Sequence, residues 1–285
     1  MARNRVRFTH SLRPLLAVGV AASLTLLAGC GEAAKPAPAK GVAPPKGEDG
    51  KDGKDGKAGK PVVVATTTWE GALAKAAGAE DVTVIVPQSV HHAPDYDPKP
   101  SDLAAVAKAD FVLYAPFEPY AEKIKEAAGS DAELIEVKLD NSADKAAAEV
   151  ERLGGMFGTK DSAARWKSSF TSEYDKLSQE LKTAWPGGKS PAVVSQVFTA
   201  WAAEMAGART VGTYGPEAVT PAQLAALTKE KPALVLDNAH MSTGTVLPDS
   251  GAKQVKIVNY PGDDLDLLSV YRNAADELKK TMNKG

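Results

Sequence analysis

The sequence predicts an α/β protein made of two α/β lobes with parallel sheets, joined by a rigid connecting helix. In residues 61–142, short runs rich in β-branched side chains alternate with helical stretches, which is the order of a parallel sheet covered on both faces. The same alternation returns in residues 189–285. Between these two parts, residues 143–188 have helical periodicity and no strand pattern, so they predict a stiff connector.

The first lobe opens with the β-branched run Val62 to Ala65, which is typical of a buried strand. The elements expected after it are a helix at 70–77, a strand at 81–87, a helix from near Ser101, a strand at 110–116, a helix at 118–128 and a strand at 133–139. Open α/β sheets bind ligands beyond the carboxyl ends of their strands, so the segments that follow these strands are the candidate binding loops.

The connector has one apolar stripe. Its members recur at steps of three and four residues, which is the spacing of one helix face: Trp166, Phe170, Tyr174, Leu177 and Leu181. The sequence WPGG at 185–188 ends the helix. We therefore expect both lobes to pack along this helix and to move by small rotations only.

The second lobe repeats the pattern with strands expected at 191–197, 210–214, 232–240 and 253–261. Helices are expected at 198–206, after Thr220 and at 267–282. Thr220, Pro221 and Gln223 occupy the N-cap, first and third helical positions of a capping box, which predicts that the middle helix begins there.

The first residues of the chain predict export. Arginines precede an apolar run at 15–27 that is too short to span a bilayer, so residues 1–29 are typical of a secretory signal peptide. The run ends in LAGC, which resembles the bacterial lipobox, and Cys30 would then be the acylated residue after cleavage. The alternative is an incidental cysteine at the end of a signal or anchor helix. Residues 30–60 are Gly, Pro, Ala, Lys and Asp with almost no large apolar side chain, which predicts a disordered tether.

Composition excludes several other classes of partner. The formal net charge is −2, which argues against nucleic acid and against polybasic membrane binding. Cys30 is the single cysteine, so the mature protein would have no disulfide and no thiolate metal ligand. We expect an extracytoplasmic monomer, held to the cell membrane of a bacterium through a lipid anchor.

Histidine and carboxylate side chains gather in the expected binding loops. His10 leaves with the signal, so His91, His92 and His240 remain, and zinc, manganese and iron sites are built from imidazole and carboxylate. The carboxylates in reach of these loops are Asp95, Glu136 and Asp237. Neighbouring side chains on an extended loop diverge, so only one of His91 and His92 is expected to coordinate. The alternative interpretation has the pair facing solvent and His240 satisfied by backbone.

Four further side chains are candidates for the cleft between the lobes, namely Thr67, Trp69, Gln196 and Asn259. Each follows or ends an expected strand. Capping of the helix that follows is the commoner use of a threonine such as Thr67. A core position is likewise the commoner one for an aromatic residue such as Trp69.

The segments VVVATTTWEGALAKAAG, VTVIVP and YDPKPSDLAAVAKADFVLYAPFEPYAEKI resemble the first lobe of a known family. This is the zinc/manganese family of ABC-transporter substrate-binding lipoproteins, the TroA-like periplasmic solute-binding proteins. The similarity weakens in the connector and returns after Gln196 and in the last helix. The resemblance implies two lobes on a rigid helix, a divalent metal between them, and delivery to a membrane permease.

The ligand positions depart from that family. Its first histidine falls where this chain has Pro94-Asp95, with His92 two residues earlier. Its second falls in a His-x-x-Leu-Asp pattern that is EVKLD here, so Glu136 takes that place. Its third position falls near Gln196 and its closing aspartate near Asn259.

Three functions follow from these observations. The first is an extracytoplasmic lipoprotein that binds a divalent metal ion, zinc or manganese, and delivers it to an ABC importer. Of the two metals, zinc is the preferred prediction. The second is a binding protein of the same fold that has lost the metal and holds a small organic ligand or acts as an accessory. The third is a metal-dependent hydrolase. The sequence contains neither HExxH nor GxSxG, so we expect the protein not to be an enzyme.

Overall fold

The computed structural model describes residues 60–90 and 93–282, which belong to one compact unit spanning residues 54–285. The predicted signal peptide, Cys30 and most of the predicted tether lie outside the described residues, as do His91 and His92. Within the described ranges, no helix combines the length and the apolar character needed to cross a membrane.

The first lobe is a four-stranded parallel sheet in the order β2-β1-β3-β4. Its strands are β1 (Val62–Thr67), β2 (Asp81–Val86), β3 (Phe111–Tyr114) and β4 (Glu133–Glu136). The helical elements between them are α1 (Thr68–Ala76), the 3-10 turn η1 (Ala93–Asp95), α2 (Pro100–Val106) and α3 (Ala121–Ala127). The central strand β1 is buried along most of its length, as its run of β-branched residues predicts.

The second lobe repeats this topology, with a parallel sheet in the order β6-β5-β7-β8. Its strands are β5 (Ala192–Gln196), β6 (Arg209–Tyr214), β7 (Leu234–Asn238) and β8 (Lys253–Ile257). Its helical elements are the 3-10 turn η3 (Val197–Thr199), α6 (Ala200–Met205), α7 (Pro221–Lys229) and α8 (Leu267–Met282). The capping box of α7 forms as predicted, because Gln223 N donates to Thr220 Oγ1 and Thr220 N donates to Gln223 Oε1.

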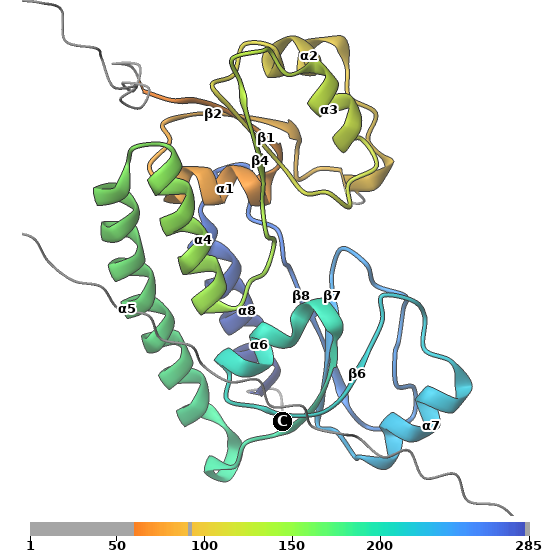
Figure 1. Cartoon of the computed structure of the whole chain (residues 1–285). Helices are drawn as coiled ribbons and strands as arrows, with labels where there is room; N and C mark the ends of the chain where they lie inside the picture. The colour runs from red at the N-terminus through yellow and green to blue at the C-terminus, as the bar shows by residue number, and fades with distance from the viewer. Residues whose placement is uncertain (1–59, 91–92, 283–285) are drawn as a thin grey trace, which may run out of the picture. The chain divides into compact units, whose positions relative to one another are not determined.

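Two helices connect the lobes, α4 (Ala143–Met156) and α5 (Lys160–Ala184), and the 3-10 turn η2 (Pro186–Gly188) follows them. Figure 1 shows α4 and α5 side by side. Gly154 makes their close approach possible, because a Cβ there would lie 2.5 Å from Cβ of Ala163. The predicted stripe of α5 faces inward, where Phe170 stacks on Trp166 at a centroid distance of 4.7 Å and meets Tyr271 of α8 edge-on at 5.0 Å.

One large apolar core joins the two lobes. It contains one face of each sheet together with α1, α4, α5, α6 and α8, so both sheets pack against the same helical layer. The opposite face of the first sheet packs on α2 and α3, and that of the second packs on α7 and on Val246 and Leu247. The predicted fold class is confirmed, with two parallel α/β lobes on a helical backbone.

One element begins later than the sequence predicts. The helix expected from Glu118 begins at Ala121 instead. Glu118 turns its carboxylate back onto the chain, where Oε2 accepts a hydrogen bond from Ala115 N at 3.0 Å. The backbone of Glu118 also accepts from Ala121 N at 3.0 Å, so these residues form a turn ahead of the helix.

Candidate functional site

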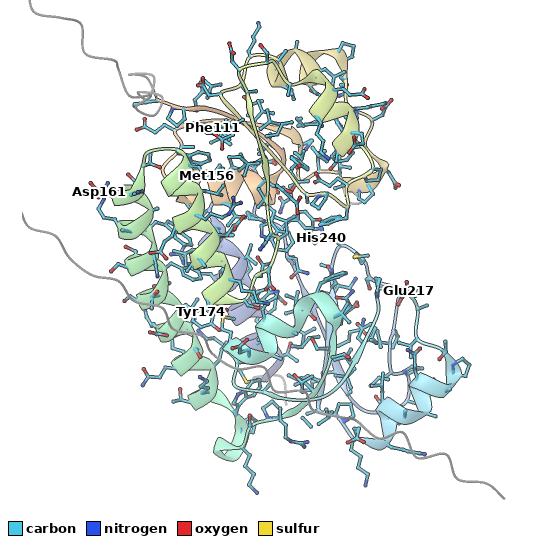
Figure 2. The ribbon with its side chains drawn as sticks, viewed as in Figure 1. Phe111, Met156, Asp161, Tyr174, Glu217 and His240 are labelled. Carbon is cyan, nitrogen blue, oxygen red and sulfur yellow. The ribbon has the colours of Figure 1, made fainter. Side chains whose placement is uncertain are left out.

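A cavity of about 470 Å³ lies at the carboxyl ends of strands from both sheets. This is the position at which open α/β sheets bind ligands. Figure 2 shows His240 at the level where the two lobes face each other. From the first lobe the cavity is lined by Thr67, Thr68, Trp69, Val86, Pro87, Gln88, Val90, Ala93, Pro94, Phe117 and Leu139. From the second lobe it is lined by Phe198, Pro216, Asn238, His240, Met241, Asn259 and Tyr260.

The N-terminal cap of α1 positions the residues that line the cavity on the first-lobe side. Thr67 ends β1, and its hydroxyl accepts from Trp69 N at 3.2 Å as the N-cap of α1. Glu70 completes the capping box by accepting from Thr67 N at 3.2 Å and from the Thr67 hydroxyl. The helix start therefore fixes Thr67 and Trp69, and both line the cavity as well as serving the local structure.

On the second-lobe side the residues after β8 are tied to both lobes. Asn259 is buried, and its Oδ1 accepts from Trp201 Nε1 at 2.9 Å. Its backbone oxygen accepts from Nδ2 of Asn141, just before α4, at 3.0 Å. Asn259 is therefore fixed in the cavity wall by Trp201 of the second lobe and by Asn141 at the end of the first lobe.

His240 is half-buried in the cavity lining and lies two residues beyond the end of β7. Its backbone N–H donates to Asn238 Oδ1 at 3.0 Å, an Asx turn that sets the direction of the loop. Its ring meets Tyr260 edge-on at a centroid distance of 4.7 Å, and Tyr260 meets Trp69 edge-on at 5.4 Å. Three aromatic rings thus connect the second-lobe loop to the first helix of the first lobe.

Of the four predicted cleft residues, Thr67, Trp69 and Asn259 line the cavity. Gln196 is buried behind it, where Oε1 accepts from Phe198 N at 2.7 Å. Gly215 packs closely against Gln196, since a Cβ there would lie 3.1 Å from the Gln196 side chain, and its φ of +88° also favours glycine. Gln196 thereby positions Phe198, whose side chain does line the cavity.

The structure does not bring the three predicted carboxylates into the cavity lining. Glu136 ends β4 with an exposed side chain, and Asp95 is exposed on η1, one residue after the lining residue Pro94. Asp237 is fully buried inside the second lobe. His91 and His92 lie outside the described residues, although Val90 and Ala93 on either side of them line the cavity.

Asp237 is a hydrogen-bond acceptor for three side chains. Tyr214 Oη donates to its Oδ1 at 2.7 Å, and Ser242 Oγ and Gln254 Nε2 donate to its Oδ2 at 2.6 and 2.9 Å. Burial and the hydrogen bond to Asp237 raise the pKa of Tyr214, so its hydroxyl stays a donor. Gln254 Nε2 also donates to Gly244 O at 2.8 Å. This network holds the loop that carries His240.

Two buried carboxylates that the sequence did not predict as part of the site, Glu70 and Glu118, lie beside the cavity. Glu70 and Glu118 are both buried, and each charge raises the cost of ionising the other. Burial, followed by the charge of Glu70, raises the pKa of Glu118 to about 8, and burial raises the pKa of Glu70. Burial also raises the pKa of Tyr260 to about 12, and the charges of Glu70 and Glu118 contribute smaller shifts in the same direction. The sequence does not indicate that Glu70 is buried beside a second carboxylate, because a glutamate at the third helical position predicts only a role in the N-terminal cap.

Within the part of the chain that the structure describes, no cluster of three or more His, Cys, Asp or Glu side chains is assembled that could hold a metal ion. His240 is the one member of these four residue types among the described residues that line the cavity. Most of the other lining residues are apolar or carry amide or hydroxyl groups.

The first lobe matches a protein-family model. The model is described as the zinc-uptake complex component A, periplasmic, and it matches residues 63–152. A search of curated protein sequences gives no significant match.

Solved structures share the fold across most of this chain. The laminin-binding protein Lmb of Streptococcus agalactiae, described as having adhesin and metal-transporting activity, is 16% identical with a TM-score of 0.58, covering 78% of this chain and 99% of its own. The protein FpvC of Pseudomonas aeruginosa, solved with Mn²⁺, is 14% identical with a TM-score of 0.56, covering 79% and 99%. A Zn(II)-bound mutant variant of AdcAII from Streptococcus pneumoniae is 16% identical with a TM-score of 0.53, covering 76% and 99%.

Proposed function

We propose that this chain, whose first lobe matches the zinc-uptake family model, is an extracytoplasmic solute-binding protein that delivers a divalent metal to an ABC importer. The observation that carries the proposal is the position of His240. It lines a cavity at the carboxyl ends of strands from both sheets, on a fold shared with metal-binding proteins. A binding and delivery role accounts for this arrangement without any catalytic step.

We propose zinc as the metal. Imidazole nitrogen is a good ligand for zinc, whereas manganese prefers sites rich in carboxylate oxygen. His240 would supply one nitrogen, and one of His91 and His92 a second, since the lining residues Val90 and Ala93 flank that pair. We assign no oxygen ligand to Asp95, Glu136 or Asp237, because none of these carboxylates lines the cavity.

The test is metal titration of the purified full-length chain. Zinc, manganese and nickel chlorides are added separately, and binding is followed by calorimetry and by the melting temperature, which rises with the concentration of a ligand that binds the folded state. His240→Ala and the double variant His91→Ala/His92→Ala are each expected to weaken zinc binding at least tenfold. Glu217→Gln, on an exposed loop of the second lobe, is the control and is expected to bind like the wild type.

Protons compete with the metal for imidazole. Free histidine titrates near pH ~6.5, so zinc affinity should fall as the pH drops below that value. If zinc, manganese and nickel all leave the melting curve of the wild type unmoved, the proposal that the cavity binds the bare metal ion is wrong. Binding by His240→Ala that equals the wild type would remove His240 from the ligand set.

A lipid anchor at Cys30 would keep the protein at the membrane, beside its permease. Cys30→Ala is expected to release the protein into the soluble fraction after export, because acylation is the anchor that the lipobox-like sequence predicts. Fractionation followed by immunoblotting measures this. Retention of Cys30→Ala in the membrane fraction would contradict the anchor and leave the metal-binding proposal untouched.

A further inference from the structure

The cavity is larger and more apolar than a bare metal ion needs. A zinc site takes about four donor atoms at close range, while a cavity of about 470 Å³ falls in the range of sites that enclose small organic molecules. His240 is the one His, Cys, Asp or Glu side chain among the described lining residues. If one of His91 and His92 supplies a second nitrogen, as proposed above, about two of the four zinc ligands would still have to come from groups other than these histidines.

Three of the other polar residues of the lining, Thr67, Asn238 and Asn259, already make hydrogen bonds within the protein. Thr67 Oγ1 caps α1, and Asn238 Oδ1 accepts from the backbone N–H of His240. Asn259 accepts from Trp201 through Oδ1 and from Asn141 through its backbone oxygen. Recruiting these oxygens as ligands would break contacts that hold the cavity walls.

The remaining surface of the cavity suits an organic body. Phe117 of the first lobe is 67% exposed, and Phe198 and Met241 of the second lobe are 51% and 37% exposed, yet all three line the cavity. Apolar side chains left open to water on both sides of one cavity favour a ligand with an apolar or aromatic part. A hydrated ion would gain nothing from such walls, because its water shell cannot hydrogen-bond to them.

We propose that the cargo is a divalent metal carried in a small organic chelator with an apolar or aromatic body. In this arrangement His240 takes one coordination position on the metal, and Phe117, Phe198 and Met241 contact the body of the chelator. The inference rests on the proposed function, because it requires a metal at His240, and it names the chemical form in which that metal arrives.

The probe is the 1:1 complex of zinc with terpyridine, a flat aromatic chelator that fills three coordination positions and leaves room for an imidazole. Calorimetry on the purified full-length chain compares this complex with zinc chloride alone and with terpyridine alone. We expect the complex to bind at least tenfold more tightly than either component. Protein, zinc and chelator should remain together at 1:1:1 after desalting, as measured by elemental analysis and by chelator absorbance.

Two aromatic variants test the contact with the chelator body. Phe117→Ala and Phe198→Ala change side chains that are at least half exposed, so the fold should survive, and the melting temperature verifies this. Each should lower the preference for the complex over zinc alone at least tenfold. Leu134→Ala is the matched control, since Leu134 is 41% exposed and does not line the cavity. His240→Ala should also abolish the preference.

The outcomes separate this inference from the proposed function. If zinc alone binds as tightly as the complex, the chelator proposal is overturned and the metal-delivery function stands. If terpyridine alone matches the complex, the metal is not recognised and the chelator proposal is overturned. If neither zinc nor the complex binds, both proposals fail together. If Phe117→Ala and Phe198→Ala both keep the wild-type preference for the complex over zinc alone, the proposed contact between these phenylalanines and the chelator is likewise overturned.

Discussion

The imidazole of His240 stands edge-on to the ring of Tyr260, with centroids 4.7 Å apart and ring planes at 66°. Tyr260 in turn stands edge-on to Trp69, with centroids 5.4 Å apart. His240 and Tyr260 follow strands of the second sheet, while Trp69 lies in the first turn of α1. Tyr260 therefore links a ligand bound at His240 to Trp69 of α1 in the first lobe.

Tyr260→Ala should weaken zinc binding about twofold to tenfold, because edge-on aromatic pairs contribute about 0.5–1.5 kcal/mol and this one restrains the His240 ring. Tyr260→Phe keeps the ring and should bind like the wild type. Calorimetry with zinc chloride measures both variants. Wild-type affinity in Tyr260→Ala would show that the ring does not position His240.

The buried carboxylates predict a stability that depends on pH. The pKa of Glu118 rises from 4.5 to about 8 in the folded protein, first through burial and then through the charge of Glu70. The folded state therefore holds a proton that the unfolded state releases, so the free energy of unfolding should fall as the pH rises from about 4.5 to about 8 and then level off. Each unit of pKa shift corresponds to about 1.4 kcal/mol, so the loss amounts to a few kcal/mol.

Glu118→Gln isolates this effect, because the amide resembles the protonated acid and does not ionise. Urea unfolding at a series of pH values should give a flatter profile for this variant than for the wild type. Glu126→Gln, at an exposed position of α3, is the control and should keep the wild-type slope. Parallel profiles for Glu118→Gln and the wild type would mean that Glu118 is ionised at neutral pH.

Asp237 should matter for stability. Asp237→Asn turns an acceptor of three side-chain hydrogen bonds into a group that must present an N–H₂ to some of the same donors. The free energy of unfolding should fall by about 1–3 kcal/mol, which is the cost of leaving a buried polar group unsatisfied. Chemical denaturation checks this, with exposed Glu217→Gln as the neutral comparison. A loss below about 0.5 kcal/mol would mean that the network rearranges at little cost.

Two adjacent glycines of α4 should respond in opposite directions to alanine. At Gly154 a new Cβ would lie 2.5 Å from Cβ of Ala163, so Gly154→Ala should force α4 and α5 apart and destabilise the fold by about 1–3 kcal/mol. At Gly155 the nearest atom is 3.9 Å away, at the flexible end of Lys160. Gly155→Ala should therefore be neutral or stabilising by up to about 1 kcal/mol, as expected for a helix interior. Thermal unfolding of both variants tests the contrast, and similar shifts would contradict it.

The sequence by itself determined the order of elements and the class of fold. Hydrophobic runs and turn signals are local, so the strands at Val62–Thr67 and Leu234–Asn238 and the cap at Thr220 follow from neighbouring residues alone. The helix start expected at Glu118 was wrong, because its carboxylate bonds the backbone of Ala115 and forms a turn that composition does not reveal.

Tertiary structure alone decided which side chains share the cavity. Asp237 and His240 are close in the sequence, yet one accepts hydrogen bonds inside the second lobe and the other lines the cavity, because Asp237 belongs to β7 whereas His240 lies beyond it on a loop whose direction the Asx turn of Asn238 sets. Glu70 and Glu118 come from separate segments, and only the packing of the first lobe places their charges beside each other. Spacing along the chain carries no record of these long-range contacts, because they depend on how the sheets and helices pack in three dimensions.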